Sequence, residues 1–168
     1  MIIVRAETSK DIEAVRRVNQ LAFGRAEEAN LVDALRLAAH PYISLVAETG
    51  GRVAGHIFFS PVTIETEVRA PAIFGLAPMA VLPEHQNQGI GSRLVREGLN
   101  ECRRISVGAV VVLGHPAYYP RFGFVPASSK GLRCEYPVPD EAFMVTELTP
   151  GELPSQGLVK YHPEFGNV

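Results

Sequence analysis

The chain has 168 residues and a mass of 18.3 kDa, which predicts a single domain spanning residues 1–168. Apolar residues make up 46% of the sequence and charged residues 20%, which argues against a disordered, collagenous or coiled-coil chain. The formal net charge is −2, so no basic excess favours general binding to nucleic acid or to an anionic membrane. An anionic ligand would have to be bound by a local group of residues rather than attracted by the overall charge.

The sequence shows neither a membrane span nor a secretion signal. The longest uncharged stretch, Ala70 to Pro83, has 14 residues and contains three prolines, so it is too short and too interrupted to span a bilayer. Charged residues from Arg5 onward leave no apolar core for a signal peptide, and we expect a cytoplasmic protein. Cys102 and Cys134 are the only cysteines, which excludes a four-cysteine zinc site. A single disulfide between these two cysteines is the alternative, but we expect two reduced thiols and no metal.

Two amphipathic helices are predicted near the N-terminus, after a short apolar run from Ile2 to Arg5. The segment Thr8–Asp11 has the pattern of a helix N-cap, and the helix is expected to run to about Phe23. Its apolar residues recur at steps of three and four, as on a face that covers a core: Ile12, Val15, Val18, Leu21 and Ala22. A second helix, Glu28 to Ala38, repeats the pattern with Leu31, Val32, Leu35 and Ala38.

Strands are predicted in the middle of the chain. Ser44–Glu48 and Val53–Thr66 flank the glycine-containing turn Thr49–Arg52, which is typical of a β-hairpin. Ala72–Val81 is a further strand, but Pro78 within it cannot donate a ladder hydrogen bond. We therefore expect a bulge or a local loss of pairing at Pro78.

A strand–helix–strand unit follows. Gly89–Arg104 carries one apolar helical face, formed by Ile90, Leu94, Val95, Leu99 and Cys102, and Gly108–Gly114 is a wholly apolar strand. Beyond this unit the sequence predicts a short helix over Pro116–Phe122, the start of a strand over Gly123–Pro126 and a strand over Phe143–Leu148, before a tail rich in proline and glycine.

The junction between residues 81 and 94 is the most informative segment, because a strand end is followed by a glycine turn and a helix start. Gly89 and Gly91 let the backbone approach a ligand, and the free N–H groups of the first helical turn favour an anion such as a pyrophosphate. The glycines could instead serve only the tight turn. Neither GxxxxGK[ST] nor GxGxxG occurs here, which disfavours binding of a nucleoside triphosphate or a dinucleotide.

The pattern Gln86-x-x-Gly89-x-Gly91 after an apolar strand resembles motif A of the GNAT superfamily of acetyl-CoA-dependent N-acetyltransferases, whose loop takes the coenzyme A pyrophosphate. A second segment, Ala117–Phe124, is similar to the aromatic-Tyr-x-x-x-Gly-Phe signature of the same family. Order and spacing agree over nearly the whole chain, and residues 157–162 resemble the YhbS-like branch of the superfamily. The resemblance implies an α/β GNAT-like acyl-CoA N-acyltransferase fold, with a mixed, mostly antiparallel sheet that is flanked by helices and has a parallel pair at its centre.

The resemblance also implies that acetyl-CoA or coenzyme A lies in a cleft between the fourth and fifth strands. The backbone of Met79, Ala80 and Val81 would pair with the pantetheine arm, where the irregularity expected at Pro78 leaves backbone groups free. The pyrophosphate would be bound by the loop and the first helical turn, through Asn87, Gln88, Gly89, Ile90, Gly91 and Ser92.

Direct acetyl transfer to an amine requires an acceptor for the amine proton and an acid for the departing thiolate. Tyr119 matches the family position whose phenol reaches the coenzyme A sulfur, and aromatic packing is the alternative role of this side chain. His115 ends the buried strand just before Tyr119 and is the candidate base, at a point where many relatives carry an Asn. The strand segment 74–81 holds no carboxylate, whereas many family members have one there.

The other candidate side chains are assigned structural or solvent roles. Tyr118 is expected to be core or pocket wall, Glu84 and His85 to be solvated loop residues, and His56 to be held by structural hydrogen bonds. Cys134 is the more plausible nucleophile of the two cysteines and Cys102 is a packing residue, but no partner His lies near either in sequence, so covalent catalysis is not favoured.

The predicted function is acetyl transfer from acetyl-CoA to a primary amine of a small molecule or a protein, and a homodimer remains open. A non-catalytic acyl-CoA binding or sensing module is the alternative, which the missing strand carboxylate favours. A general anion-binding domain is disfavoured because two motifs agree at the right spacing. The sequence does not identify the acceptor.

Overall fold

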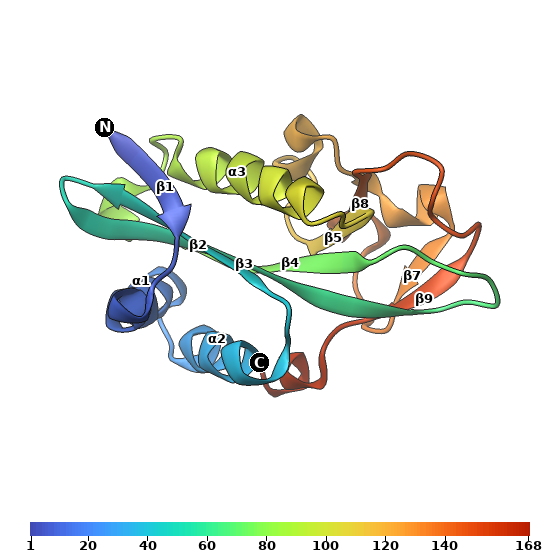
Figure 1. Ribbon diagram of the computed structural model, residues 1–168, viewed down its shortest axis with the longest axis horizontal. Helices are drawn as coiled ribbons and strands as arrows, with labels where there is room; N and C mark the ends of the chain where they lie inside the picture. The colour runs from blue at the N-terminus through green and yellow to red at the C-terminus, as the bar shows by residue number, and fades with distance from the viewer.

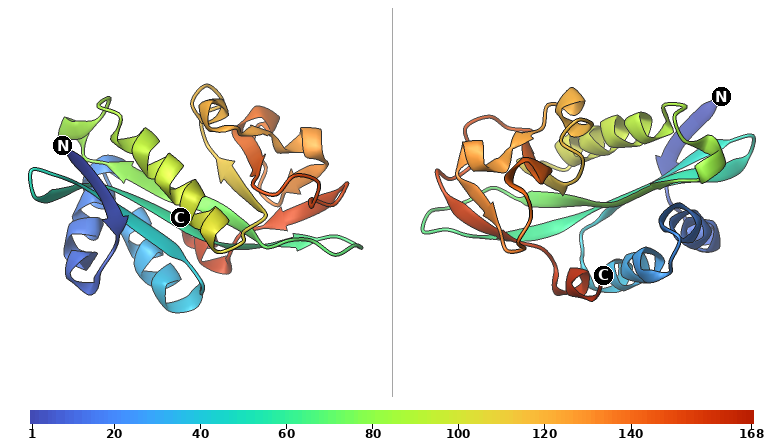
Figure 2. Two further views of the ribbon diagram at one scale, coloured as in Figure 1. Left: turned by 45° about the horizontal axis from the view of Figure 1, so that its top comes forward. Right: turned by 180° about the vertical axis from the view of Figure 1, so that it is seen from behind.

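The computed structural model describes residues 1–168, in which one twisted sheet has α3 on one face and α1, α2 and the C-terminal turn on the other (Figure 1). The view from behind shows the same two layers, with the C-terminus beside α2 (Figure 2). The helices are α1 (Ile12–Phe23), α2 (Glu27–Ala38) and α3 (Ile90–Arg104). The strands are β1 (Ile2–Ala6), β2 (Ile43–Thr49), β3 (Arg52–Glu65), β4 (Ile73–Val81), β5 (Ala109–Leu113), β6 (Val125–Pro126), β7 (Leu132–Cys134), β8 (Phe143–Glu147) and β9 (Gly157–Lys160).

The sheet confirms the predicted fold class. Its main order is β1-β2-β3-β4-β5-β8-β6, and every neighbouring pair on this path is antiparallel except β4 and β5. The parallel pair is joined through α3, as the strand–helix–strand prediction requires. The distal end of β3, Thr63–Glu65, pairs with β9, and β9 pairs in parallel with β7.

The two N-terminal helices form where the apolar periodicity places them. The N-cap prediction is confirmed, because Thr8 and Asp11 form a reciprocal capping box just before α1. Val15, Val18 and Asn19 form the buried stripe of α1, and Leu21 lies outside this stripe with 47% of its surface exposed. The prediction that Leu21 belongs to the core face was therefore wrong, because Asn19, a polar residue, takes a position on that face.

The core is divided between the two faces of the sheet. Val110 and Val112 of β5 face the cluster under α3, whereas Ala109 and Val111 face a second cluster on the opposite side. The packing under α3 is close: a Cβ atom at Gly98 would lie 2.2 Å from the Phe59 ring, so only glycine fits this position. All five apolar residues predicted for the inner face of α3 are buried.

The irregularity predicted at Pro78 is present as a bulge in β4. Ile57 of β3 pairs with Met79, but Phe59 pairs with Leu76, so β4 has one residue more than β3 in this stretch. The pairing of β4 with β5 covers only Ile73–Gly75 and Ala109–Val111. Beyond this point the two strands separate, and the edge of β4 that carries Met79–Val81 is not paired with β5.

The C-terminal third differs most from the sequence prediction. The short helix expected over Pro116–Phe122 is a single 3₁₀ turn, η3 (Tyr119–Phe122), and the tail contains β9 and another 3₁₀ turn, η6 (Pro163–Asn167). None of the helices has both the length and the hydrophobicity needed to span a membrane.

Candidate active site

The loop between β4 and α3 presents unpaired backbone donors. Gly89 caps α3 with a φ of 85°, and Asn87 has a φ of 62°, so both residues turn the chain through the left-handed region. The N–H groups of Ile90, Gly91 and Ser92 belong to the first helical turn, where no carbonyl of the helix can accept them, and no side chain caps the helix. With the positive end of the helix dipole behind them, these N–H groups suit an anion.

A pocket of about 520 Å³ lies over this turn and includes most of the predicted cofactor-binding residues: Met79, Val81, Asn87, Gly89, Ile90, Gly91 and Ser92. Two predicted residues do not line it. The side chain of Ala80 is buried in the core, and the side-chain amide of Gln88 donates to the carbonyl of Glu84 at 3.4 Å. No three His, Cys, Asp or Glu side chains lie close enough together to hold a metal ion.

Four further residues line this pocket: Tyr118, for which pocket wall was one of the two expected roles, and His85, Gln86 and Arg121, which the sequence did not assign to it. The Tyr118 hydroxyl is 3.2 Å from the Ser92 hydroxyl, which connects η3 to the first turn of α3. The Arg121 guanidinium lies over the Tyr118 ring at 4.6 Å, and Arg121 Nε donates to the Tyr118 carbonyl at 2.8 Å. Arg121 is thus a fixed cation beside the unpaired amides. Tyr118 and Arg121 stand in the aromatic signature, but only the fold brings this signature to α3.

Tyr119 is packed at the end of β5 with only 7% of its surface exposed. Its ring contacts Tyr118 and Phe124 edge-on, with ring centroids at 5.1 and 5.6 Å. A Cβ atom at Gly114 would lie 2.3 Å from the Tyr119 ring, so the strand needs glycine here. Burial, together with the neighbouring Tyr118, raises the pKa of the Tyr119 phenol to about 12. The phenol therefore keeps its proton at every pH below that value.

His115 lies in the turn between β5 and η3, and its side chain is exposed. Its carbonyl accepts the N–H groups of Tyr118 at 3.1 Å and Tyr119 at 3.4 Å, so the backbone of His115 fixes the start of η3. The structure therefore brings His115 and Tyr119 into one turn, at the end of β5 where the strands have separated.

His56 is a structural residue, as predicted. It is fully buried between β2 and α1, with Nε2 2.9 Å from the Ser44 hydroxyl and Nδ1 3.2 Å from the Asn19 amide nitrogen. Burial, assisted by the positive charge of Arg36, lowers the pKa of His56 to about 3. The imidazole is therefore neutral at physiological pH.

Neither cysteine is a thiolate. Both are free, which confirms the expectation of two reduced thiols. Burial raises the pKa of the Cys102 thiol to about 12, and burial also raises the pKa of Cys134. Of the remaining sequence candidates, Glu84 is exposed as expected, whereas His85 is half-buried and lines the pocket rather than lying in solvent.

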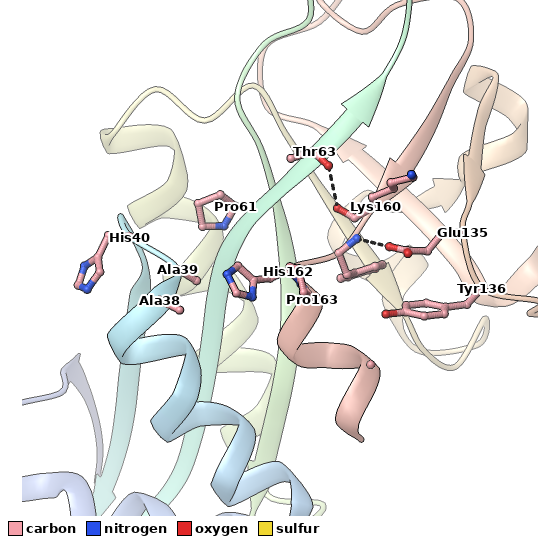
Figure 3. Close-up of a pocket in the computed structure, with 12 residues that line it drawn as sticks. Ala38, Ala39, His40, Pro61, Thr63, Glu135, Tyr136, Lys160, His162 and Pro163 are labelled. Carbon is pink, nitrogen blue, oxygen red and sulfur yellow. Dashed lines mark hydrogen bonds between the residues drawn. The ribbon is translucent and has the colours of Figure 1, made fainter.

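A larger pocket, of about 620 Å³, lies elsewhere (Figure 3). Glu135 and Tyr136 form one side of it, and His40 with the end of α2 forms the other, around β3. The one helix start at this space belongs to the short turn η6, where His162 Nδ1 already accepts the N–H of Glu164 at 3.2 Å. The smaller pocket at α3 is therefore the better anion site in spite of its size.

Three comparisons with known proteins agree. Residues 3–127 match the family described as acetyltransferase (GNAT) domain. The chain is 40% identical to the uncharacterized N-acetyltransferase YjhQ of Escherichia coli K12 over 156 residues, covering 89% of this chain and 86% of YjhQ. It is 37% identical to the uncharacterized N-acetyltransferase YhbS of the same strain over 166 residues, covering 98% of both chains.

Two solved structures are similar along their whole length. The first is E. coli YhbS in complex with CoA, with a TM-score of 0.87 and 35% identity, covering 98% of this chain and 92% of that chain. The second is a GNAT family acetyltransferase from Brucella melitensis in complex with acetyl-CoA, with a TM-score of 0.80 and 37% identity, covering 98% of both chains.

Proposed function

The chain belongs to the GNAT acetyltransferase family, and we propose that it transfers the acetyl group of acetyl-CoA directly to a primary amine of a small molecule or a protein. The observation that carries this proposal is the pocket at the start of α3, where unpaired amides meet the unpaired edge of β4. The similar structures from E. coli and B. melitensis, solved with CoA and acetyl-CoA, support it.

The residues of this pocket fit the two ends of the coenzyme. The N–H groups of Ile90, Gly91 and Ser92 would bind the pyrophosphate, with the guanidinium of Arg121 as a counter-charge. The backbone of Met79–Val81 would hydrogen-bond the amides of the pantetheine arm, because β5 no longer pairs with this part of β4. This arrangement would direct the thioester toward the separation of the two strands.

Tyr119 is the proposed general acid. As the amine nitrogen bonds to the thioester carbonyl carbon, the C–S bond breaks, and the leaving sulfur takes the phenolic proton. No hydrogen bond within the chain competes for this proton, and burial keeps it on the phenol. The phenolate then recovers a proton from solvent.

His115 is the proposed base. The amine must reach the thioester unprotonated and must lose one further proton during transfer. His115 is exposed at the end of β5, in the turn that also holds Tyr119, so its imidazole can pass this proton to bulk water. No carboxylate lines the coenzyme pocket, so no acidic side chain there competes for this role.

The experiment is thiol release from acetyl-CoA in the presence of a panel of primary amines, with the acetylated product identified by its mass. The absence of a carboxylate also favours the second candidate, a binding or sensing module. That candidate predicts tight acetyl-CoA binding without thiol release for any amine, and such a result would overturn our proposal. We also propose a cytoplasmic location, where the two free thiols stay reduced.

A further inference from the structure

A third pocket, of about 260 Å³, is lined only by apolar and aromatic residues. Ala77 of β4 and Leu113 of β5 form its floor, and the C-terminal third of the chain covers it with Tyr136, Val138 and Phe165. Phe165 belongs to η6, on the face of the sheet that also carries α2 (Figure 1). No charged side chain lines this space.

The floor of this pocket lies at the separation of β4 and β5. The last paired residues of the two strands are Gly75 and Val111, and Ala77 and Leu113 each stand two residues further on. In a regular strand, side chains two residues apart lie on the same face of the sheet. The bulge in β4 interrupts this alternation, so Ala77 lines this pocket whereas Met79 lines the coenzyme pocket beside α3. The two pockets therefore approach the separation of the strands from opposite faces of the sheet.

Tyr161 adds a polar group to the wall. It is 6% exposed, and its ring lies between those of Tyr136 and Phe165, with centroid distances of 6.0 and 5.3 Å. The ring packs on β4 at Gly75, where a Cβ atom would be 2.9 Å from it. Its hydroxyl is buried and has no hydrogen-bond partner in the chain. Buried hydroxyls are nearly always paired, so this hydroxyl lacks a partner that the chain does not supply.

We infer that the acceptor is a primary amine attached to an apolar, ring-bearing body, and that this body occupies the pocket of Ala77, Leu113, Tyr136, Val138, Tyr161, Phe165 and Val168. The inference rests on the proposed function and specifies the acceptor class of that same site. The amine would lie at the floor, between Ala77 and Leu113, where the strand separation gives access to the thioester on the other face.

Size and polarity favour this acceptor class. An apolar cavity of about 150 Å³ is enough for a benzene ring, so 260 Å³ accommodates a ring with a short alkyl chain. No side chain of this pocket offers a counter-charge to a polyamine or to an extended lysine side chain. Glu135 lines the adjacent 620 Å³ pocket, and its carboxylate already accepts the N–H of Tyr161 at 2.6 Å.

The test uses 2-phenylethylamine as the probe. The amine is titrated by calorimetry into the protein saturated with CoA, a state without turnover, and ethanolamine and spermidine are the polar comparison amines. We expect 2-phenylethylamine to bind at least about tenfold more tightly than either comparison amine, and kcat/KM with acetyl-CoA to follow the same order.

Two variants locate the binding. Val138→Phe fills the pocket from a loop position and should weaken binding of 2-phenylethylamine at least about tenfold, with CoA affinity unchanged. Val68→Phe, at an exposed valine outside the pocket, is the matched control and should change neither affinity. Tyr161→Phe keeps the ring and removes the unpaired hydroxyl, so the thermal midpoint should not fall, whereas amine affinity should fall about three- to tenfold.

The outcomes separate this inference from the proposed function. Acetylation of polar amines at a rate that Val138→Phe leaves unchanged would overturn the inference and leave the proposed function intact, as would undetectable binding of 2-phenylethylamine. Faster transfer from octanoyl-CoA than from acetyl-CoA, with amine binding unaffected in Val138→Phe, would assign the pocket to the acyl chain and also overturn the inference. Binding of CoA without acetylation of any amine would instead overturn the proposed function.

Discussion

Among single residues, Tyr119 carries the most direct prediction. Replacing it by Phe keeps the ring that packs against Phe124 and Gly114 and removes only the proton donor. We expect kcat to fall by about 10² to 10⁴, or by less where water reaches the sulfur, with CoA affinity unchanged. The measurement is steady-state kinetics together with the thermal midpoint of Tyr119→Phe.

Tyr118→Phe is the matched control, because it removes a neighbouring hydroxyl that contacts Ser92 rather than the core. It should weaken CoA binding more than it lowers kcat. If Tyr119→Phe were fully active and stable, Tyr119 would be a packing residue and the site would lack an assigned acid.

His115 is tested by the pH dependence of the rate. A base must be deprotonated to act, so kcat/KM falls on the acidic side of the profile where the base is protonated. His115→Asn should lower the rate and flatten this acidic limb, whereas Glu84→Gln, at an exposed loop position, should retain it. Loss of the acidic limb only in Glu84→Gln would transfer the role of base to that carboxylate.

His56 makes a prediction about stability. Its pKa is about 3 in the folded chain, compared with about 6.5 for an unburied histidine, so below pH 6.5 the unfolded state binds a proton that the folded state does not. The stabilisation is complete above pH 6.5 and is lost as the pH falls toward 3. Between pH 6 and pH 5, above the range where carboxylates titrate, His56 should lower the free energy of unfolding by about 1 kcal/mol.

Denaturant titrations at the two pH values measure this difference. His115→Asn, which removes an exposed imidazole, should leave the difference unchanged. An independent readout is the NMR shift of the His56 ring protons, which should stay constant from pH 7 to pH 4. A His56 ring that titrates near pH 6 would contradict the prediction.

For the elements, the start of α3 is tested at Gly91. A Cβ atom there would lie 3.1 Å from the Tyr118 hydroxyl and 3.7 Å from Met79, so a side chain enters the coenzyme pocket. Gly91→Glu adds a negative charge as well as bulk and should weaken CoA binding at least tenfold, about 1.4 kcal/mol. Gly91→Gln has the same size without the charge and should weaken binding less. Equal CoA affinity of a folded Gly91→Glu variant and the parent would remove this turn from the site.

The helices and long strands could be predicted because their signals are local. Capping residues, a strict apolar period and an uninterrupted apolar strand each depend on neighbours within a few residues, and α1, α2, α3 and β5 form accordingly. The short strands β7 and β9 have three and four residues and pair with partners far along the chain. Nothing in the proline- and glycine-rich tail specifies such pairings, so these strands were missed.

The residues of the candidate site divide in the same way, into those with a local sequence signal and those placed by long-range packing. The glycine turn and the bulge at Pro78 could be predicted, because glycine spacing and the missing proline N–H act locally. Arg121 and Tyr118 join the pocket only because η3 folds back onto α3, and Tyr161 reaches Gly75 from a distant strand end. Long-range packing of this kind leaves no periodic signal in a single sequence.

In the whole molecule, the separation of β4 and β5 connects the features that the proposed function requires. The coenzyme pocket approaches it from the side of α3, and the apolar pocket approaches it from the side of α2 and η6. Two substrates could therefore meet without competing for one entrance. A homodimer remains a prediction, which the mass in solution would check.

Ligand binding should raise the stability of the whole chain. A ligand present at 100 times its Kd stabilises the folded state by about 2.7 kcal/mol, if the unfolded chain does not bind it. For a chain of 168 residues this corresponds to a rise of about 5 to 10 °C in the thermal midpoint. We expect acetyl-CoA and CoA to produce such a shift in a thermal melt.

ATP is the control ligand, because it carries phosphates but no pantetheine arm for the unpaired edge of β4. ATP should raise the thermal midpoint less than CoA does at equal concentration. The amides of the first turn of α3 would contribute to ATP binding, but the backbone of Met79–Val81 would not. Gly91→Glu should lose most of the CoA shift. Equal shifts with ATP and CoA would mean that the pocket recognises an anion alone, and the pairing of β4 with the pantetheine arm would then be wrong.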